Sequence, residues 1–240
     1  MTNRGSWKLR FFCPQGGAGQ FQNQTCLALT LLQLVLLTIL TRWVSRHPVP
    51  LKELKVTEKS LKRQPSYVRA FIIALSTLSG SPWLGLAAGG VAVVFWKARL
   101  RVEAIMTVCL IGMSTLLRLG LKSAVHRPRP LIAPFHRQSR SASFPSGHVT
   151  SAVTFWGWSI VVGMHLSPGK YRSYRRLLVL PAIFIVLIGP TRVYLGEHWM
   201  TDTLGGYLFG GACLSAVIPI YRYTRKREHQ ATNSTEERQA

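Results

Sequence analysis

Long apolar runs are the feature of this sequence that most limits its fold. Six of them approach the length of a bilayer span: residues 25–44, 82–97, 102–121, 147–166, 176–190 and 203–221. The second and the fifth are the shortest. Backbone groups in lipid must be hydrogen-bonded within the segment, and runs of this kind without strict alternation favour helices over barrel strands. The sequence therefore predicts an all-α, polytopic membrane bundle of about six transmembrane helices.

The chain is also strongly basic. It has 30 Lys+Arg against 8 Asp+Glu, a formal net charge of +22 over 240 residues. A soluble nucleic-acid-binding protein can be equally basic, but it would not contain these apolar runs, so we expect no nucleic-acid partner. Anionic lipids, anionic substrates and the positive-inside rule remain as explanations of the charge.

The predicted membrane domain covers residues 25–222. It lies between a polar N-terminal tail, residues 1–24, and a C-terminal tail, residues 223–240, that we expect to be disordered because it is basic and polar. The first apolar run is interpreted as a retained anchor rather than a signal peptide, since no small-x-small cleavage site follows it. The cysteines have no metal-ligand spacing and are expected to be apolar thiols: Cys13, Cys26, Cys109 and Cys213.

Residues 45–81 form the longest segment between apolar runs, and they are basic. The segment ends in an apolar stretch from Tyr67 that is too short to span a membrane and fits an interfacial amphipathic helix. Substrate attraction and simple anchoring are both open for it. Two small-xxx-small patterns, at residues 85–89 and 206–210, predict close packing of their helices against neighbours.

With six spans, both tails lie on one side of the membrane, together with the short loops near residues 97–101 and 170–176. The positive-inside rule makes this side cytoplasmic. The opposite side carries a comparable number of Lys and Arg, many of them in the candidate site, so the rule alone does not decide the orientation. We predict a plasma-membrane protein with its active site on the non-cytoplasmic face, with an internal eukaryotic membrane as the alternative.

Three polar stretches at the ends of apolar runs carry the candidate chemistry. The last one contains Arg192, His198 and Asp202. His198 and Asp202 are four residues apart, so in a helix they share one face, and the carboxylate can fix the imidazole tautomer. The second imidazole nitrogen is then free to attack, and Arg192 offers a planar charged fork to a phosphate. The alternative is an interfacial cluster solvated by lipid headgroups.

The first stretch follows the third apolar run. Lys122 lies at the helix end, and Arg127 and Arg129 follow among prolines that stop the helix. We expect the three cations to converge on one rim, although snorkelling juxtamembrane charge is the alternative. Arg118, one turn before Lys122, is explained by snorkelling or as a helper on the same face.

The second stretch, Pro-Ser-Gly-His at residues 145–148, opens the fourth apolar run. Free N–H groups and the helix dipole make an anion site there, and Gly147 lets an oxyanion approach the main chain. Ser146 adds a hydroxyl, and His148 is placed to deliver a proton, unless it is only a polar cap. With alternating spans all three stretches lie on one side, which predicts a single anion-binding site.

These stretches resemble the signature of the type 2 phosphatidate phosphatase family, whose site is shared with bacterial acid phosphatases and vanadium haloperoxidases. The Lys-x6-Arg-Pro motif is matched by Lys122 and Arg129, and Pro-Ser-Gly-His by residues 145–148. Ser-Arg-x5-His-x3-Asp is matched by Arg192, His198 and Asp202, with a threonine in place of the serine. The resemblance covers about residues 67–221.

The resemblance implies a phosphatase that needs no metal or cofactor and acts through a phosphohistidine. His198 would be the nucleophile, Asp202 would orient it, and His148 would be the general acid and then the base. The phosphate-binding groups would be Lys122, Arg129, Ser146, Gly147 and Arg192. Asp202 alone is too little carboxylate for a two-metal site. By the motif spacing, Arg129 is the arginine of the motif, and Arg127, two residues earlier, is not.

The expected partners are membrane lipids and a lipid phosphate or diphosphate whose tail stays in the bilayer. Phosphatidate, phosphatidylglycerophosphate, a polyprenyl diphosphate and a sphingoid phosphate all remain open, and so does the oligomeric state. A vanadate haloperoxidase is disfavoured because those relatives are soluble. The better alternative is a non-catalytic lipid-phosphate binding or transport protein, although such relatives lose motif residues that this chain retains.

Overall fold

The computed structural model describes residues 17–62, 65–78, 80–130, 141–166 and 176–239, and over these residues the regular structure is helical. In chain order the helices are α1 (Gly17–Arg46), α2 (Leu51–Lys62), α3 (Ser66–Leu78), α4 (Ser81–Lys97), α5 (Arg101–Val125), α6 (Gly147–Leu166), α8 (Val179–Tyr194) and α9 (Met200–Gln239). The predicted all-α fold class is confirmed.

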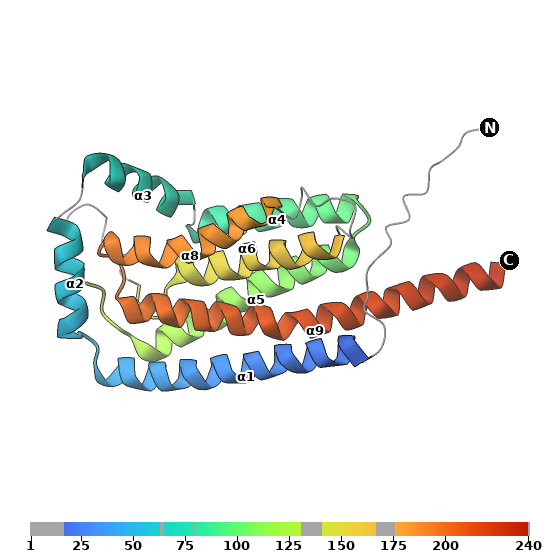
Figure 1. Ribbon diagram of the computed structural model, residues 1–240, viewed down its shortest axis with the longest axis horizontal. Coiled ribbons are helices and arrows are strands. Elements are labelled where there is room, and N and C mark those ends of the chain that lie inside the picture. Colours follow the sequence, from blue (N-terminus) through green and yellow to red (C-terminus); the bar gives the residue numbers. More distant parts are fainter. Residues whose placement is uncertain (1–16, 63–64, 79, 131–140, 167–175, 240) are drawn as a thin grey trace.

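Four of the described helices, α1, α5, α6 and α9, are long and apolar enough to cross a membrane. The two shortest predicted spans correspond to α4 and α8, which have 17 and 16 residues and lie beside the longer helices (Figure 1). The six helices of the bundle run in alternating directions. The C-terminal end of α5, the N-terminal end of α6 and the α8–α9 turn therefore lie at one end of the bundle (Figure 1).

This end is crossed by α2, a helix that the sequence does not predict (Figure 1). Glu53 and Thr57 are buried on one face of α2, with 9% and 0% of their surface exposed. The predicted short helix after it is present as α3, on which Tyr67 and Phe71 are exposed. Buried polar groups on a basic helix indicate that α2 is bound to the bundle through specific partners rather than through apolar area alone.

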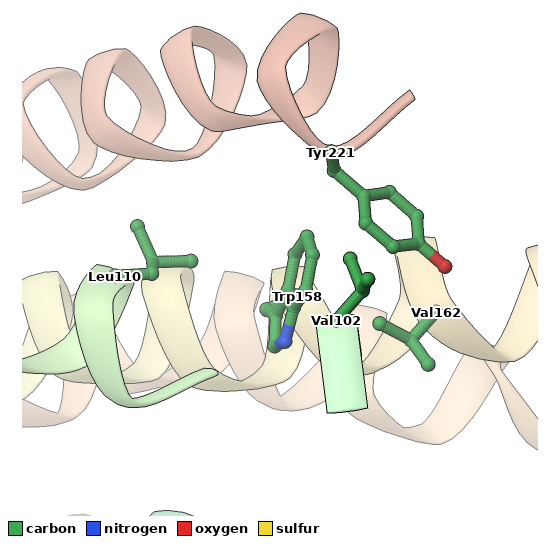
Figure 2. Packing of buried hydrophobic residues seen from close by; sticks show 5 residues of the cluster. All are labelled: Val102, Leu110, Trp158, Val162 and Tyr221. Atoms are coloured by element: carbon green, nitrogen blue, oxygen red, sulfur yellow. The ribbon is translucent and has the colours of Figure 1, made fainter. Parts of the chain in front are cut away.

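Toward the other end of the bundle, Trp158 of α6 lies among Val102 and Leu110 of α5 and Tyr221 of α9 (Figure 2). The Trp158 and Tyr221 rings meet edge to face, with their centroids 5.1 Å apart. The indole N–H donates to Thr107 at 2.8 Å. Because the buried aromatic groups are both packed and hydrogen-bonded, this cluster fixes α5, α6 and α9 relative to one another.

Glycines bring α9 close to α6. A Cβ atom built on Gly206 would lie 2.9 Å from the carbonyl oxygen of Ser146, and one on Gly210 would lie 2.9 Å from the Cβ of Val153. The predicted close packing is thus confirmed for residues 206–210. For residues 85–89 it is wrong: no atom lies within 4 Å of a Cβ built on either glycine, because that face of α4 meets none of the described neighbours.

Both predicted tails are partly helical. Residues 17–24 belong to α1, and α9 continues to Gln239 through the segment for which the sequence predicts disorder. Ion pairs stabilise the first turns of this extension, because Arg225 contacts the buried Glu103 at 3.2 Å and also pairs with Glu228 on the next turn. Of the four cysteines, Cys13 lies outside the described residues and the other three are free thiols.

Candidate active site

His198 lies in the turn between α8 and α9, and Asp202 lies in the first turn of α9. Both side chains are buried, with 1% and 0% exposed. The Nδ1 atom of His198 is 3.4 Å from Oδ2 of Asp202, which also accepts the Trp199 backbone N–H at 3.0 Å. The predicted pairing across four residues is therefore present, and it directs the other imidazole nitrogen, Nε2, away from the carboxylate.

That second nitrogen faces Arg129. The distance from Arg129 Nη1 to His198 Nε2 is 3.5 Å. The guanidinium is fixed from three sides, because it donates to the carbonyl and the hydroxyl of Ser141 and to the carbonyl of Glu197, each at 3.1 Å. A rigid cation beside an unprotonated imidazole nitrogen is suited to hold an anion where that nitrogen can reach it.

The electrostatic environment keeps His198 neutral. Burial lowers the pKa of His198 well below the ordinary imidazole value, and the charges of Arg129, Arg192 and Lys122 lower it further. A hydrogen bond with the Ser143 backbone opposes this shift. A neutral imidazole retains the lone pair that a nucleophile needs, so the same cations that suit an anion also preserve the reactive form of the ring.

The Pro-Ser-Gly-His stretch forms the N-terminal end of α6, which begins at Gly147. The backbone N–H of Ser146 donates to the carbonyl of Asp202 at 3.0 Å. The Ser146 hydroxyl is buried without a hydrogen-bond partner among the described residues. His148 lies within electrostatic range of Arg192 and His198. Because buried hydroxyls are nearly always satisfied, the Ser146 oxygen points to a ligand.

Lys122 and Arg118 lie on one buried face of α5, each with 7% of its surface exposed. The ammonium of Lys122 donates to the Ala142 carbonyl, and its charge acts on the same cluster as that of Arg129. The snorkelling interpretation of Arg118 is wrong, because a snorkelling guanidinium is exposed. The helper interpretation agrees with the structure, in which Arg118 lies within electrostatic range of Lys122.

Arg192 comes from the last turn of α8 and is 1% exposed. It donates to the hydroxyl of Ser76 on α3 and forms an ion pair with Glu197. Its Nε atom is buried without a hydrogen-bond partner in the described part of the chain. Arg192 therefore retains a free donor in the same region as the Ser146 hydroxyl.

Hydrogen bonds join the three stretches into one unit. The Ser143 N–H donates to the Arg127 carbonyl at 2.8 Å, and the Ser143 hydroxyl donates to the Pro128 carbonyl at 3.0 Å. The indole N–H of Trp199 donates to the same Pro128 carbonyl at 2.9 Å. The proline-rich turn thus connects the α6 N-terminus to the α8–α9 turn, as expected from alternating spans.

The sequence predicts that Lys122, Arg127 and Arg129 converge on one rim, but the structure places Arg127 elsewhere. Arg127 does not share the rim with Lys122 and Arg129; its side chain is fully buried and bonds to Asp202 at 2.6 Å. Two further contacts, Glu53 of α2 and Ser76 of α3, were not predicted. An acidic residue inside a basic segment of a chain with only 8 Asp+Glu was the available signal for Glu53.

The arrangement supplies positive charge through side chains. No group of three or more His, Cys, Asp or Glu residues is placed to hold a metal ion within the described ranges. The charges of Arg129, Arg192 and Lys122 act on His198, and Arg129 lies 3.5 Å from its Nε2 atom. Such a site can bind a dianion and offer it a neutral nitrogen nucleophile, which is the combination that phosphoryl transfer requires.

Known proteins share sequence and fold with this chain. Phosphatidylglycerophosphatase B of Bacillus subtilis is 32% identical over 108 residues, which cover 45% of this chain and 53% of that protein. The lipid A 1-phosphatase of Rhizobium johnstonii is 31% identical over 109 residues, covering 41% of this chain and 40% of that protein. The chain thus spans about half the length, or less, of these relatives.

The crystal structure of a transmembrane PAP2 type phosphatidylglycerolphosphate phosphatase from Bacillus subtilis has the same fold. It superimposes with a TM-score of 0.68 at 24% identity, over 78% of this chain and 93% of that one. Together with the long apolar helices, this makes the protein an integral membrane protein. The family model of the PAP2 superfamily matches residues 103–226, just over half of the sequence, and the chain therefore belongs to the PAP2 superfamily.

Proposed function

We propose that this protein is a membrane-embedded lipid phosphate phosphatase that removes the terminal phosphate of a lipid phosphate or diphosphate. The observation that carries the proposal is the geometry of His198, with Nδ1 held toward Asp202 and Nε2 beside Arg129 at 3.5 Å. The relatives named as phosphatases of phosphatidylglycerophosphate and of lipid A support a phosphorylated lipid as substrate.

In the first step, His198 Nε2 attacks phosphorus and the bond from phosphorus to the lipid oxygen breaks. His148 donates a proton to that oxygen, so the lipid leaves as a neutral alcohol. Arg129, Arg192 and Lys122, together with the Ser146 hydroxyl and the Gly147 N–H, hold the phosphoryl oxygens. These donors stabilise the charge that spreads over the oxygens in the transition state.

In the second step, His148 takes a proton from water, and the resulting hydroxide attacks the phosphohistidine. The bond from phosphorus to His198 breaks, inorganic phosphate leaves, and both histidines return to their starting protonation states. Asp202 accepts a hydrogen bond from the Nδ1–H of His198 throughout, which holds the ring in the tautomer with a free Nε2. The three cationic side chains and the helix N-terminus supply the positive charge, so the proposed reaction needs no metal ion.

The test is phosphate release from short-chain phosphatidate by purified protein in detergent micelles that contain a chelator. The expected result is turnover that vanadate inhibits, since vanadate adopts the five-coordinate geometry of the transition state. Lipid binding without phosphate release would favour the non-catalytic alternative. Turnover that requires added Mg²⁺ would contradict the proposed mechanism.

We also propose that the site faces the non-cytoplasmic side of a cell membrane. The basic loop between α4 and α5, around Lys97 and Arg101, lies at the opposite end from the site, and the positive-inside rule assigns that end to the cytoplasm. Single cysteines replacing the exposed Lys52 and Lys97, in a chain without native cysteines, would test this. An impermeant maleimide should label position 52 on intact cells and position 97 only after permeabilisation; the reverse pattern would overturn the orientation.

A further inference from the structure

Arg127 and Arg129 lie two residues apart on one proline-rich turn, but their guanidinium groups serve different partners. Arg129 lies beside His198 Nε2, the nitrogen proposed to meet phosphorus. The Arg127 side chain is 0% exposed and lies behind the imidazole, at the carboxylate. The chain therefore places one cation on each side of the proposed nucleophile.

The Nε and Nη1 donors of Arg127 are engaged, whereas Nη2 is buried without a hydrogen-bond partner among the described residues and lies 3.9 Å from Oε2 of Glu53. Its Nε atom donates to the Pro48 carbonyl at 3.1 Å. Its Nη1 atom donates to the Thr201 hydroxyl at 2.7 Å and to Asp202 Oδ1 at 2.6 Å. The guanidinium carbon lies 5.6 Å from the centroid of the Trp199 ring. Because the side chain is 0% exposed and its free Nη2 lies toward the carboxylate of Glu53, Arg127 has no surface to offer a phosphate.

The two oxygens of the Asp202 carboxylate have different partners. Oδ1 accepts from Arg127, whereas Oδ2 accepts the Trp199 N–H and faces His198 Nδ1. The carboxylate is 0% exposed, and a buried carboxylate that has no cation takes up a proton instead of remaining charged. Arg127 is thus the group that lets the Asp202 carboxylate act on the imidazole.

The outer side of Arg127 is bounded by α2. Oε2 of Glu53 lies 3.9 Å from Arg127 Nη2 and 3.2 Å from the Thr201 hydroxyl. Pro48, which precedes α2, supplies the carbonyl that accepts from Nε. The segment from Pro48 through α2 therefore forms a second layer that orients Arg127, which explains why this basic helix crosses the end of the bundle.

We infer that Arg127 is a positioning residue for the reaction, acting through Asp202 on His198, and that α2 holds it in place. The inference rests on the proposed function, and it assigns to Arg127 a role distinct from phosphate binding. Removal of Arg127 should lower the rate of attack without weakening the binding of an anion.

A double-mutant cycle tests this on the full chain. Arg127→Ala, Asp202→Asn and the double variant are compared with wild type for kcat on short-chain phosphatidate and for inhibition by vanadate. Arg127→Ala alone should lower kcat about 10²-fold, the order expected when a group that orients a reacting side chain is lost. In the Asp202→Asn background the same change should cost less than about threefold, because the partner through which it acts is gone.

Arg129→Ala is the matched control from the same turn. It should raise the vanadate inhibition constant at least about tenfold, because a charge-assisted bond to the anion is lost. Arg127→Ala should change that constant less than about threefold, within the usual additivity error. Equal weakening of vanadate binding by both changes would make Arg127 a phosphate ligand and overturn the inference, and so would full additivity of the losses in kcat.

If Arg127→Ala is misfolded and does not elute as a monodisperse species, Arg127→Lys tests the same inference. One ammonium cannot bond Pro48, Thr201 and Asp202 at once, so kcat should fall while vanadate inhibition stays at the wild-type value. Wild-type kcat in this variant would overturn the inference. Wild-type protein that releases no phosphate would overturn the proposed function itself, whereas an active wild type with additive losses would overturn the inference alone.

Discussion

Arg192, one of the proposed phosphate ligands, is paired with Glu197, the residue directly before His198. The guanidinium is 1% exposed and the carboxylate 14% exposed, so the pair lies at the edge of the buried site. An arriving phosphate would meet a cation that already holds a carboxylate. The free Nε of Arg192 can meet the phosphate directly, but the Nη2 group reaches it only if the ligand displaces Glu197.

Glu197→Gln is expected to lower the vanadate inhibition constant about fivefold, a change of about 1 kcal/mol. The reason is that a buried guanidinium without its anionic partner is destabilised, and the ligand restores that partner. Glu197→Asp, which retains the charge, is the control and should change the constant less. Weaker vanadate binding in the glutamine variant would show that Glu197 supports the ligand site instead of competing for it.

A second prediction concerns the contact between α9 and α6. Gly206→Ala should lower both the melting temperature and the activity, because the new Cβ would lie 2.9 Å from the Ser146 carbonyl oxygen, and backbone cannot yield like a flexible side chain. Overpacking of this kind costs about 1–3 kcal/mol. Gly85→Ala on α4 meets no atom within 4 Å and should leave activity unchanged. Equal effects of the two changes would contradict the packing argument.

The two glycine patterns also show where prediction from sequence stops. Both have the same spacing in apolar helices, and nothing in either sequence tells which face meets a neighbour. By contrast, Lys122, His148 and His198 were brought together by topology, since alternating helices place their ends on one side. Local spacing and alternation therefore sufficed for the candidate site.

The contacts that support the site from behind could not be predicted from the sequence. Arg127 was assigned as an imitation of Arg129 because motif spacing counts residues but does not give the direction of a side chain on an irregular turn. Glu53 and Ser76 lie on helices that precede the motifs by many residues, and their contacts depend on how α2 and α3 fold back onto the bundle end. The sequence marks Glu53 as an acidic residue in a basic segment, but it does not show which residue Glu53 contacts.

The pKa of His198 leads to a pH-dependent prediction of stability. In the unfolded chain an imidazole takes up a proton below about pH 6.5. Burial and Arg129 lower the pKa in the folded protein, so the folded state does not take up this proton in the same range. The unfolded state then binds more protons, and stability falls as the pH drops below about 6.5, by up to about 1.4 kcal/mol per pH unit.

The measurement is the melting temperature in detergent of wild type and His198→Gln between about pH 7 and pH 5. The glutamine variant should lose less stability on acidification because it has no imidazole to protonate at this position. The difference should disappear above about pH 7, where both states of the wild-type imidazole are neutral. Parallel loss in both proteins would contradict the lowered pKa.

The last prediction separates the proposed roles of His198 and His148. An alkyl phosphate leaves as a basic alkoxide and needs a proton, so His148→Ala should slow its cleavage about 10²–10⁴-fold. An ester of an acidic phenol leaves without that proton, so the same variant should still transfer the phosphoryl group to His198. The phosphohistidine should then accumulate, because the attacking water has lost its base.

The experiment is a trapping assay with radiolabelled phosphate esters, quenched in alkali so that phosphohistidine survives. His148→Ala should give a strong label with the phenyl ester and a weak one with the alkyl ester, whereas His198→Ala should give none with either. His198 is buried with Nδ1 toward Asp202, so the nitrogen proposed to carry the label is lost with the ring in this variant. If both variants lost the label equally, whatever the leaving group, His148 would form part of the site without moving protons.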